Sequence, residues 1–210
     1  QLQVWHPATG VEQQLQDLLN RRWMLTCQLV TLRQSLRDVP TLQAAAHRLE
    51  QEYMRVFEEI DQQLEALVCS QDDLRQGVQR LRSITGIGAQ ASIRLGAIFS
   101  RVAFDNADAV VAYSGLDPRP SDSGAKKGKR RLSKRGSGEL RRQLYLAAFA
   151  ASRSKVFRTE YARLKAKGFA TTQALVILAR RLLRIAWAVW RTGVPFEPAR
   201  FEPARLMTAA

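Results

Sequence analysis

The segment VEQQLQDLLNRRWMLTCQLVTLRQSL, residues 11–36, decides the fold class of this 210-residue chain. Its apolar residues recur in steps of four and three, which is the spacing of a heptad seam along one side of an α-helix. They are Val11, Leu15, Leu18, Leu25, Leu29, Leu32 and Leu36, with Arg22 at the one polar seam position. The spacing predicts a coiled-coil helix.

A second heptad seam follows a break at residues 38–41. Pro40 has no backbone N–H, and Thr41 is suited to cap a new helix. Apolar residues then continue at heptad spacing: Leu42, Ala46, Leu49, Tyr53, Val56, Ile60 and Leu67. Residues 1–80 are therefore predicted to be a coiled-coil oligomerisation hairpin, with antiparallel helices over 11–37 and 41–80. Heptads do not reveal whether further helices come from the same chain or from a second copy.

Residues 81–192 are predicted to form a compact helical domain. It opens with LRSITGIGAQASIRLGAIF, residues 81–99, in which Gly86 and Gly88 suggest a helix-hairpin-helix-like turn whose free N–H groups can hold a phosphate. A plain packing turn would also use these glycines. Later helix boundaries are predicted at Asp105 or Asn106, Gly115, Ser137, Gly168, Thr171 or Thr172, and Gly193. No strand pattern competes, so the fold class is all-α, with a flexible tail over 193–210.

The positive charge of the chain is unevenly distributed. Residues 1–80 carry 8 basic and 11 acidic side chains, whereas 81–210 carry 25 and 8, giving a net charge of +14. Such a field attracts nucleic acid, so the binding face is predicted in the second part. The apolar segment 175–190 contains Arg180, Arg181 and Arg184, whose insertion cost argues against a membrane span.

Both cysteines, Cys27 and Cys69, fall in helical patterns and are predicted to be small core residues, not disulfide or metal ligands. This usage fits a reducing cytoplasm, and a nucleic-acid partner suggests association with the nucleoid. The chain begins at Gln1 without a recognisable signal peptide, and we expect it to be a fragment.

The segment SDSGAKKGKRRLSKRGSGELRR, residues 121–142, contains nine Lys or Arg and two acids and is too polar for a core. It is predicted to be a surface loop whose cations bind phosphate: Lys126, Lys127, Lys129, Arg130, Arg131, Lys134, Arg135, Arg141 and Arg142. Binding alone would explain this charge. Ser123, beside Gly124, is also a candidate nucleophile, although it needs a base or metal from elsewhere because His6 and His47 lie in the hairpin. The competing tyrosines are predicted to pack within helices: Tyr113, Tyr145 and Tyr161.

Five features in order resemble the C-terminal transposase domain of the IS110 insertion-sequence family, which includes pilin-gene invertases. They are GIG at 86–88, the spacing from Arg101 to Phe104, AYSGLDPRPSDSG at 112–124, GKRRLSKRG at 128–136 and ELRRQLYLAA at 139–148. The resemblance covers 81–192 and implies that Ser123 links covalently to DNA. It further implies an N-terminal RuvC-like domain that holds Mg²⁺ through a DEDD carboxylate set, and a structured guide RNA.

No RuvC-like domain precedes residue 11, so this chain is expected to hold no metal or cofactor itself and not to cut DNA alone. The predicted function is DNA transposition or site-specific recombination, with DNA, a guide RNA and a second copy of the chain as partners. One alternative is a nucleic-acid-binding and oligomerisation module without chemistry. Another is an RNA- or ribosome-associated basic protein, which needs only charge and leaves the order of the motifs unexplained.

Overall fold

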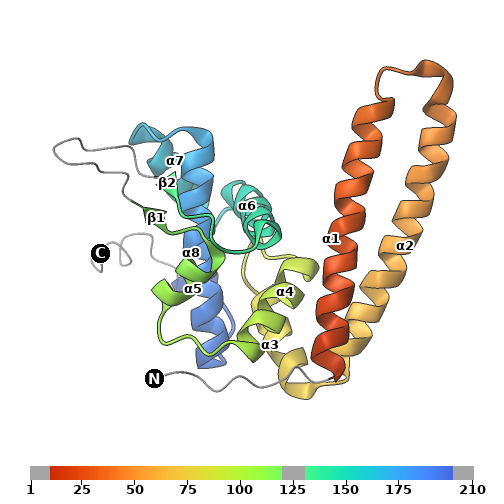
Figure 1. Ribbon diagram of the computed structural model, residues 1–210. Coiled ribbons are helices and arrows are strands. Elements are labelled where there is room, and N and C mark those ends of the chain that lie inside the picture. The colour runs from red at the N-terminus through yellow and green to blue at the C-terminus, as the bar shows by residue number, and fades with distance from the viewer. Residues whose placement is uncertain (1–9, 120–130, 201–210) are drawn as a thin grey trace. The chain divides into compact units, whose positions relative to one another are not determined.

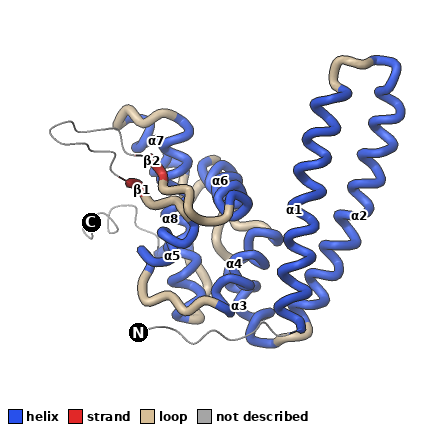
Figure 2. The backbone as a smooth tube through the Cα atoms, in the orientation of Figure 1, coloured by secondary structure: helices blue, strands red, loops and turns tan. Residues whose placement is uncertain are grey.

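The computed structural model describes residues 10–119 and 131–200, and these residues are built almost wholly from α-helices (Figures 1 and 2). The all-α prediction is confirmed. The two strands are short: β1 spans Pro118–Arg119 and β2 spans Arg131–Leu132. The chain divides into two compact units, Gln1–Arg75 and Gln76–Ala210.

The first unit is an antiparallel helical hairpin made of α1 (Gly10–Leu36) and α2 (Gln43–Cys69), joined through the 3-10 turn η1 (Pro40–Leu42). Two ion pairs set the register of the helices. Arg22 binds both carboxylate oxygens of Asp61 at 2.6 and 2.9 Å, and Arg33 pairs with Glu50 at 3.1 Å. The Arg22 guanidinium also lies 4.8 Å above the ring of Phe57. The polar seam position is thus occupied by a cation with a partner on the facing helix.

Several details of the hairpin differ from the sequence-based expectation. The helix predicted over 41–80 ends at Cys69, and α3 (Asp72–Arg82) begins after a turn. Thr41 does not cap α2, which begins after Leu42 without a side-chain cap. Cys27 and Cys69 are exposed and are not core residues, because both lie away from the line where the helices meet.

The contact line along α2 also shifts from the predicted heptad seam. Leu49 and Val56 are 48% and 40% exposed, whereas Phe57, Ile60, Leu64 and Val68 are buried. A straight α-helix has 3.6 residues per turn, so a strict seven-residue repeat rotates gradually away from its partner. The heptad residues of α2 are therefore divided between the interior of the hairpin and an outer edge.

The second unit packs its helices around α8 (Thr171–Thr192), which contacts α4 (Ala89–Arg101), α5 (Ala107–Ser114), α6 (Gly138–Ser152) and α7 (Arg158–Ala166). The buried face of α8 is almost entirely Leu and Ala, and α6 presents Ala147, Ala148 and Ala151 towards the core. These small residues on α6 allow the backbones of α6 and α8 to approach closely. None of the described helices is long and apolar enough to cross a membrane.

Most helix ends of the second unit follow the predicted capping residues, but α8 begins at Thr171 itself, with Ala170 before it, and not after Thr171 or Thr172 as predicted. The Asn106 side chain accepts a hydrogen bond from the Ala109 N–H at 2.9 Å, and Ser137 accepts one from Leu140 at 3.3 Å. Gly115 and Gly193 end α5 and α8 in the left-handed conformation, with φ of 70° and 68°. These boundaries are confirmed and fix where the connecting segments begin.

The predicted flexible tail is held to the core over its first residues. The Phe196 ring stacks on Phe157 with centroids 6.1 Å apart, and the Phe196 N–H donates to the Ser83 hydroxyl at 2.7 Å. A 3-10 turn, η2 (Pro198–Arg200), follows, and residues 201–210 lie outside the described part. The prolines of this segment suggested disorder, but Phe196 finds an apolar site that local sequence does not reveal.

Candidate nucleic-acid interface

The base of the basic segment is a two-stranded antiparallel ladder. Pro118 pairs with Leu132 and Arg119 with Arg131, so the chain leaves and returns at one place. Residues 120–130 lie outside the described part, and with them the predicted nucleophile and four predicted phosphate-binding cations: Ser123, Lys126, Lys127, Lys129 and Arg130. The structure therefore defines the two ends of this segment.

Hydrogen bonds between Asp117 and Ser133 extend the ladder. The Ser133 N–H donates to the Asp117 carbonyl at 3.0 Å, and the Ser133 hydroxyl donates to the Asp117 carboxylate. This hydroxyl is the main cause of a lowered pKa at Asp117, and Arg119, 3.6 Å from the carboxylate, lowers the pKa further. Asp117 is thus held ionised at the base of a cationic segment. We call residues 117–119 and 131–133 the hairpin base.

A tight contact between two backbone segments lies directly beside the hairpin base. The Lys134 N–H donates to the Gly115 carbonyl at 3.1 Å, and Lys134 has a φ of 54°. A Cβ at Gly136 would lie 2.1 Å from the Tyr113 carbonyl oxygen, so only glycine fits there. Lys134 is the only non-glycine residue with positive φ in the described part. Left-handed backbone costs a non-glycine residue about 1–2 kcal/mol, which the surrounding hydrogen bonds must offset.

Arg141 braces this contact from inside the protein. Its Nη1 donates to the carbonyl oxygen of Gly136 at 2.6 Å and to that of Ser114 at 3.3 Å. The structure thus gives Arg141, predicted as a phosphate ligand, an intramolecular role. Among the other predicted ligands, Arg131, Lys134, Arg135 and Arg142 have exposed side chains. These four cations are the described part of the candidate interface.

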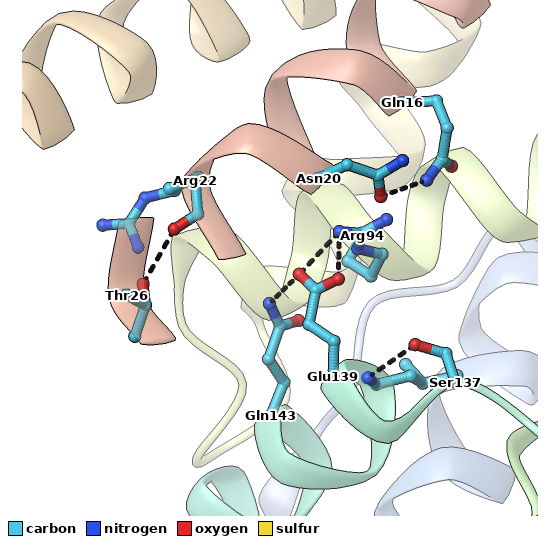
Figure 3. Close-up of polar contacts among 9 residues, drawn as sticks. Gln16, Asn20, Arg22, Thr26, Arg94, Ser137, Glu139 and Gln143 are labelled. Atoms are coloured by element: carbon cyan, nitrogen blue, oxygen red, sulfur yellow. Dashed lines mark hydrogen bonds and ion pairs between the residues drawn. The ribbon is translucent and has the colours of Figure 1, made fainter. Parts of the chain in front are cut away.

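A buried ion pair anchors the start of α6 to α4 (Figure 3). Nη2 of Arg94 lies 2.5 Å from both carboxylate oxygens of Glu139, and Nε2 of Gln143 donates to Oε1 of Glu139 at 3.2 Å. The two charged side chains are only 6% and 7% exposed. Arg94 was not among the predicted site residues, although an arginine inside the apolar run SIRLGAIF is a visible signal in the sequence.

The two glycines of the GIG turn have different surroundings. Gly86 has a φ of 97°, and a Cβ there would lie 2.5 Å from the Ala147 carbonyl oxygen on α6. Gly88 is exposed, precedes α4 without a side-chain cap, and has open space where a Cβ would project. The contact with α6 supports the packing interpretation for Gly86. An open helix N-terminus at Gly88 is compatible with an anion, so phosphate contact there stays a prediction.

The cations of α8 are largely engaged within the protein. Arg181 pairs with Glu160, and Arg184 pairs with Asp108. Burial lowers the pKa of Arg180, and the nearby Arg184 lowers it further. The basic stripe of α8 thus ties this helix to α5 and α7. Residues 10–119 and 131–200 contain no group of three or more His, Cys, Asp or Glu that could hold a metal ion.

Comparison with known proteins identifies the domain that carries these features. A model of the Transposase IS116/IS110/IS902 family matches residues 78–162, which include the GIG turn, the hairpin base and α6. Residues 78–162 form a domain of this transposase family.

Proteins similar to this chain come from several bacteria. An uncharacterized 42 kDa protein of insertion element IS900 from Mycobacterium paratuberculosis is 33% identical over 77% of this chain and 42% of its own length. A 43.6 kDa protein of insertion element IS110 from Streptomyces coelicolor is 33% identical over 59% of this chain and 32% of its own. The pilin gene-inverting protein of Moraxella bovis is 27% identical over 92% of this chain and 62% of its own. The chain thus spans less than two thirds of each of these relatives.

Proposed function

We propose that this chain supplies the DNA-binding and strand-exchanging part of a site-specific DNA recombinase. Membership of a transposase family supports this function, as does similarity to proteins named for inverting a pilin gene. The hairpin base is the structural observation that carries the proposal. It holds both ends of the segment that contains Ser123 and surrounds them with cations that can bind a DNA backbone.

In the proposed reaction, the Ser123 oxygen attacks the scissile phosphorus and forms a phosphoserine ester while the bond to the leaving DNA oxygen breaks. The serine proton passes to a base, and the leaving oxygen takes up a proton. Cations of residues 126–135, together with Arg142, offset the charge on the phosphoryl oxygens. The described residues offer no metal site, and the family resemblance assigns Mg²⁺ to a different domain, so we assign no metal-dependent step to this chain.

The nucleophile is tested by replacing Ser123 with Ala in a protein that joins this chain to the metal-binding domain implied by the resemblance. We expect covalent protein–DNA adducts, which survive denaturant, to disappear in the S123A variant. Ser121→Ala is the matched control, since it removes a hydroxyl two residues away, and it should retain the adducts. Adducts that persist in S123A would assign the nucleophile to another residue.

Binding is tested with this chain alone. Each phosphate contact removed should weaken DNA binding uniformly and reduce the slope of log affinity against log salt by about 1. We expect this for Arg131→Gln and Arg135→Gln, whereas Arg55→Gln, an exposed arginine of the hairpin paired with Glu52, should have no effect. Competition by a structured RNA from the element ends tests the proposed guide RNA, and co-localisation with the chromosome tests association with the nucleoid.

We further propose that the hairpin assembles this chain with a second copy. One heptad line on each side of the hairpin stays open at the surface. On α1 it consists of half-buried Leu18, Leu25 and Leu32, and on the other side of exposed Leu42 at the end of η1 and Leu49 and Val56 on α2. Leu67 lies five helical turns after Leu49 and therefore on the same side of α2. Leu67 also lines one shallow groove together with Leu18 of α1, so the two heptad lines open to the same side of the hairpin. A face of this spacing is suited to a four-helix arrangement with an identical hairpin.

The proposed assembly is tested by Leu49→Glu, which places a charge in the middle of the open face. We expect this variant to sediment as a smaller species than the parent chain in analytical ultracentrifugation. Met54→Glu is the matched control, because Met54 is more exposed, at 56%, and lies on a different side of α2. Equal sedimentation of the parent and the Leu49 variant would refute an interface on this face.

A second candidate function is nucleic-acid binding and assembly without chemistry. The concentration of charge in residues 81–210, with 25 basic and 8 acidic side chains, favours it independently of any nucleophile. The two candidates differ in one result. Salt-dependent DNA binding without any covalent adduct, even when the metal-binding domain is present, would favour the binding module.

A further inference from the structure

The side of α6 that points away from the core is apolar and cationic. Leu140, Leu144, Ala148 and Ala151 bury the inner side of the helix. On the opposite side four residues follow one another at helical spacing of three or four: Arg142, Leu146, Phe149 and the C-cap residue Arg153. Leu146 is 46% exposed and Phe149 40% exposed. We call these four residues the α6 outer stripe, and a surface helix usually carries polar side chains at such positions.

The C-terminal half of the stripe forms a flat, positively charged surface. The guanidinium carbon of Arg153 lies 4.1 Å from the centroid of the Phe149 ring, and both side chains are exposed. Such a cation–ring pair keeps the guanidinium group aligned above the aromatic face. The exposed plane of this pair is therefore preorganised, and Leu146, one turn earlier, extends its apolar area.

The charge of the stripe selects an anionic partner. The sole acid of α6, Glu139, is buried against Arg94 on the other side of the helix and does not neutralise the stripe. The stripe itself contains two arginines and no acid. Lys155 and Arg158, both exposed, continue the positive charge beyond the end of α6. A partner must therefore combine negative charge with flat apolar groups.

Unpaired nucleotides have this combination of properties. In a duplex the bases are stacked inside, so only phosphates would reach the arginines. Phe149 and Leu146 would then make no contact with a base. In a single strand the bases are free to stack on aromatic rings and on guanidinium planes. We propose that the α6 outer stripe binds single-stranded nucleic acid, with one base stacked on the Phe149–Arg153 pair and its neighbour on Leu146. The site shares only Arg142 with the cations proposed for the Ser123 chemistry, and it requires only that the chain binds nucleic acid.

The test measures binding of this chain to fluorescein-labelled 20-mers by fluorescence anisotropy, using single-stranded DNA, single-stranded RNA of the same sequence, and a blunt DNA duplex. We expect Phe149→Ala to weaken single-strand binding by about 5- to 150-fold, the range for losing one base stack, and to leave duplex binding within about 2-fold. Phe149→Trp should restore or tighten single-strand binding. Phe169→Ala removes another exposed ring, outside the stripe, and should have no effect.

A second substitution separates stacking from charge. Arg153→Lys keeps the positive charge but lacks the planar group, so it should weaken single-strand binding while leaving its salt dependence unchanged. The DNA and RNA strands identify which single strand is preferred. Single-strand affinity that is unchanged in both F149A and R153K overturns the proposal, and a loss of self-association in F149A with unchanged single-strand affinity assigns the stripe to a protein partner instead. Duplex binding by the parent chain tests the proposed function separately.

Discussion

Removing the carboxylate of Glu139 should be strongly destabilising, because it leaves the Arg94 cation buried without a partner. Both side chains are at most 7% exposed, and the pair joins α4 to the first turn of α6. Breaking a buried pair of this kind from one side costs about 3–5 kcal/mol. We therefore expect Glu139→Ala to lower the free energy of unfolding of the second unit by that amount, measured by urea denaturation with linear extrapolation.

The structure also predicts that removing both charges is tolerated. Nε of Arg94 has no hydrogen-bond partner among the described residues, so the pair offsets its desolvation cost incompletely. The double variant Arg94→Met, Glu139→Met should have a free energy of unfolding within about 1 kcal/mol of the parent. Each single substitution is strongly destabilising, so the coupling energy between the two sites is large. Asp108→Ala is the control, since it breaks the exposed pair with Arg184 and should cost less than about 1 kcal/mol. A double variant as unstable as E139A would refute this reasoning.

Three further predictions concern the hairpin base and its surroundings. Lys134→Gly should raise the free energy of unfolding by about 0.5–1 kcal/mol by relieving the positive φ, whereas Lys134→Ala should not. Gly136→Ala should lower the free energy of unfolding by about 1–3 kcal/mol or more, because the new Cβ would collide with the Tyr113 carbonyl oxygen. In the control Gly138→Ala the new Cβ meets only Arg141, at 3.7 Å, so thermal unfolding should be unchanged. Ser133→Ala should lower the free energy of unfolding at pH 7, because the Ser133 hydroxyl lowers the pKa of Asp117 in the folded state. That effect is present above the ordinary Asp pKa of about 3.9 and should disappear in urea titrations as the pH falls through the folded-state pKa; an effect that persists at low pH would contradict this cause.

Sequence patterns predicted the features that depend on near neighbours in the chain. Asn106 and Ser137 were recognisable as caps because a cap bonds to an N–H three residues ahead. Gly115 and Gly193 were recognisable as helix ends because the left-handed conformation favours glycine. The helical character of the hairpin followed from heptad spacing, which is also local.

Features that depend on contacts between distant residues were missed or only partly predicted. Nothing in the sequence near Ser133 indicated that its hydroxyl donates to Asp117, 16 residues earlier. The pairing of Arg94 with Glu139 spans 45 residues, and Phe196 reaches Ser83 across 113. The exposed positions of Leu49 and Val56 were missed because the rotation of a heptad line depends on where the facing helix lies.

The sequence by itself determined the all-α class, most helix boundaries and the concentration of cations in the second part of the chain. These properties follow from periodicity, backbone preferences and composition, each of which is set by residues within a few positions of one another. Only the tertiary structure decided that Arg141 braces the backbone, that Gly86 packs against α6, and that Leu146, Phe149 and Arg153 share an outward surface. The same residue types could bind phosphate or fill a core, and the choice depends on which helices fold against them.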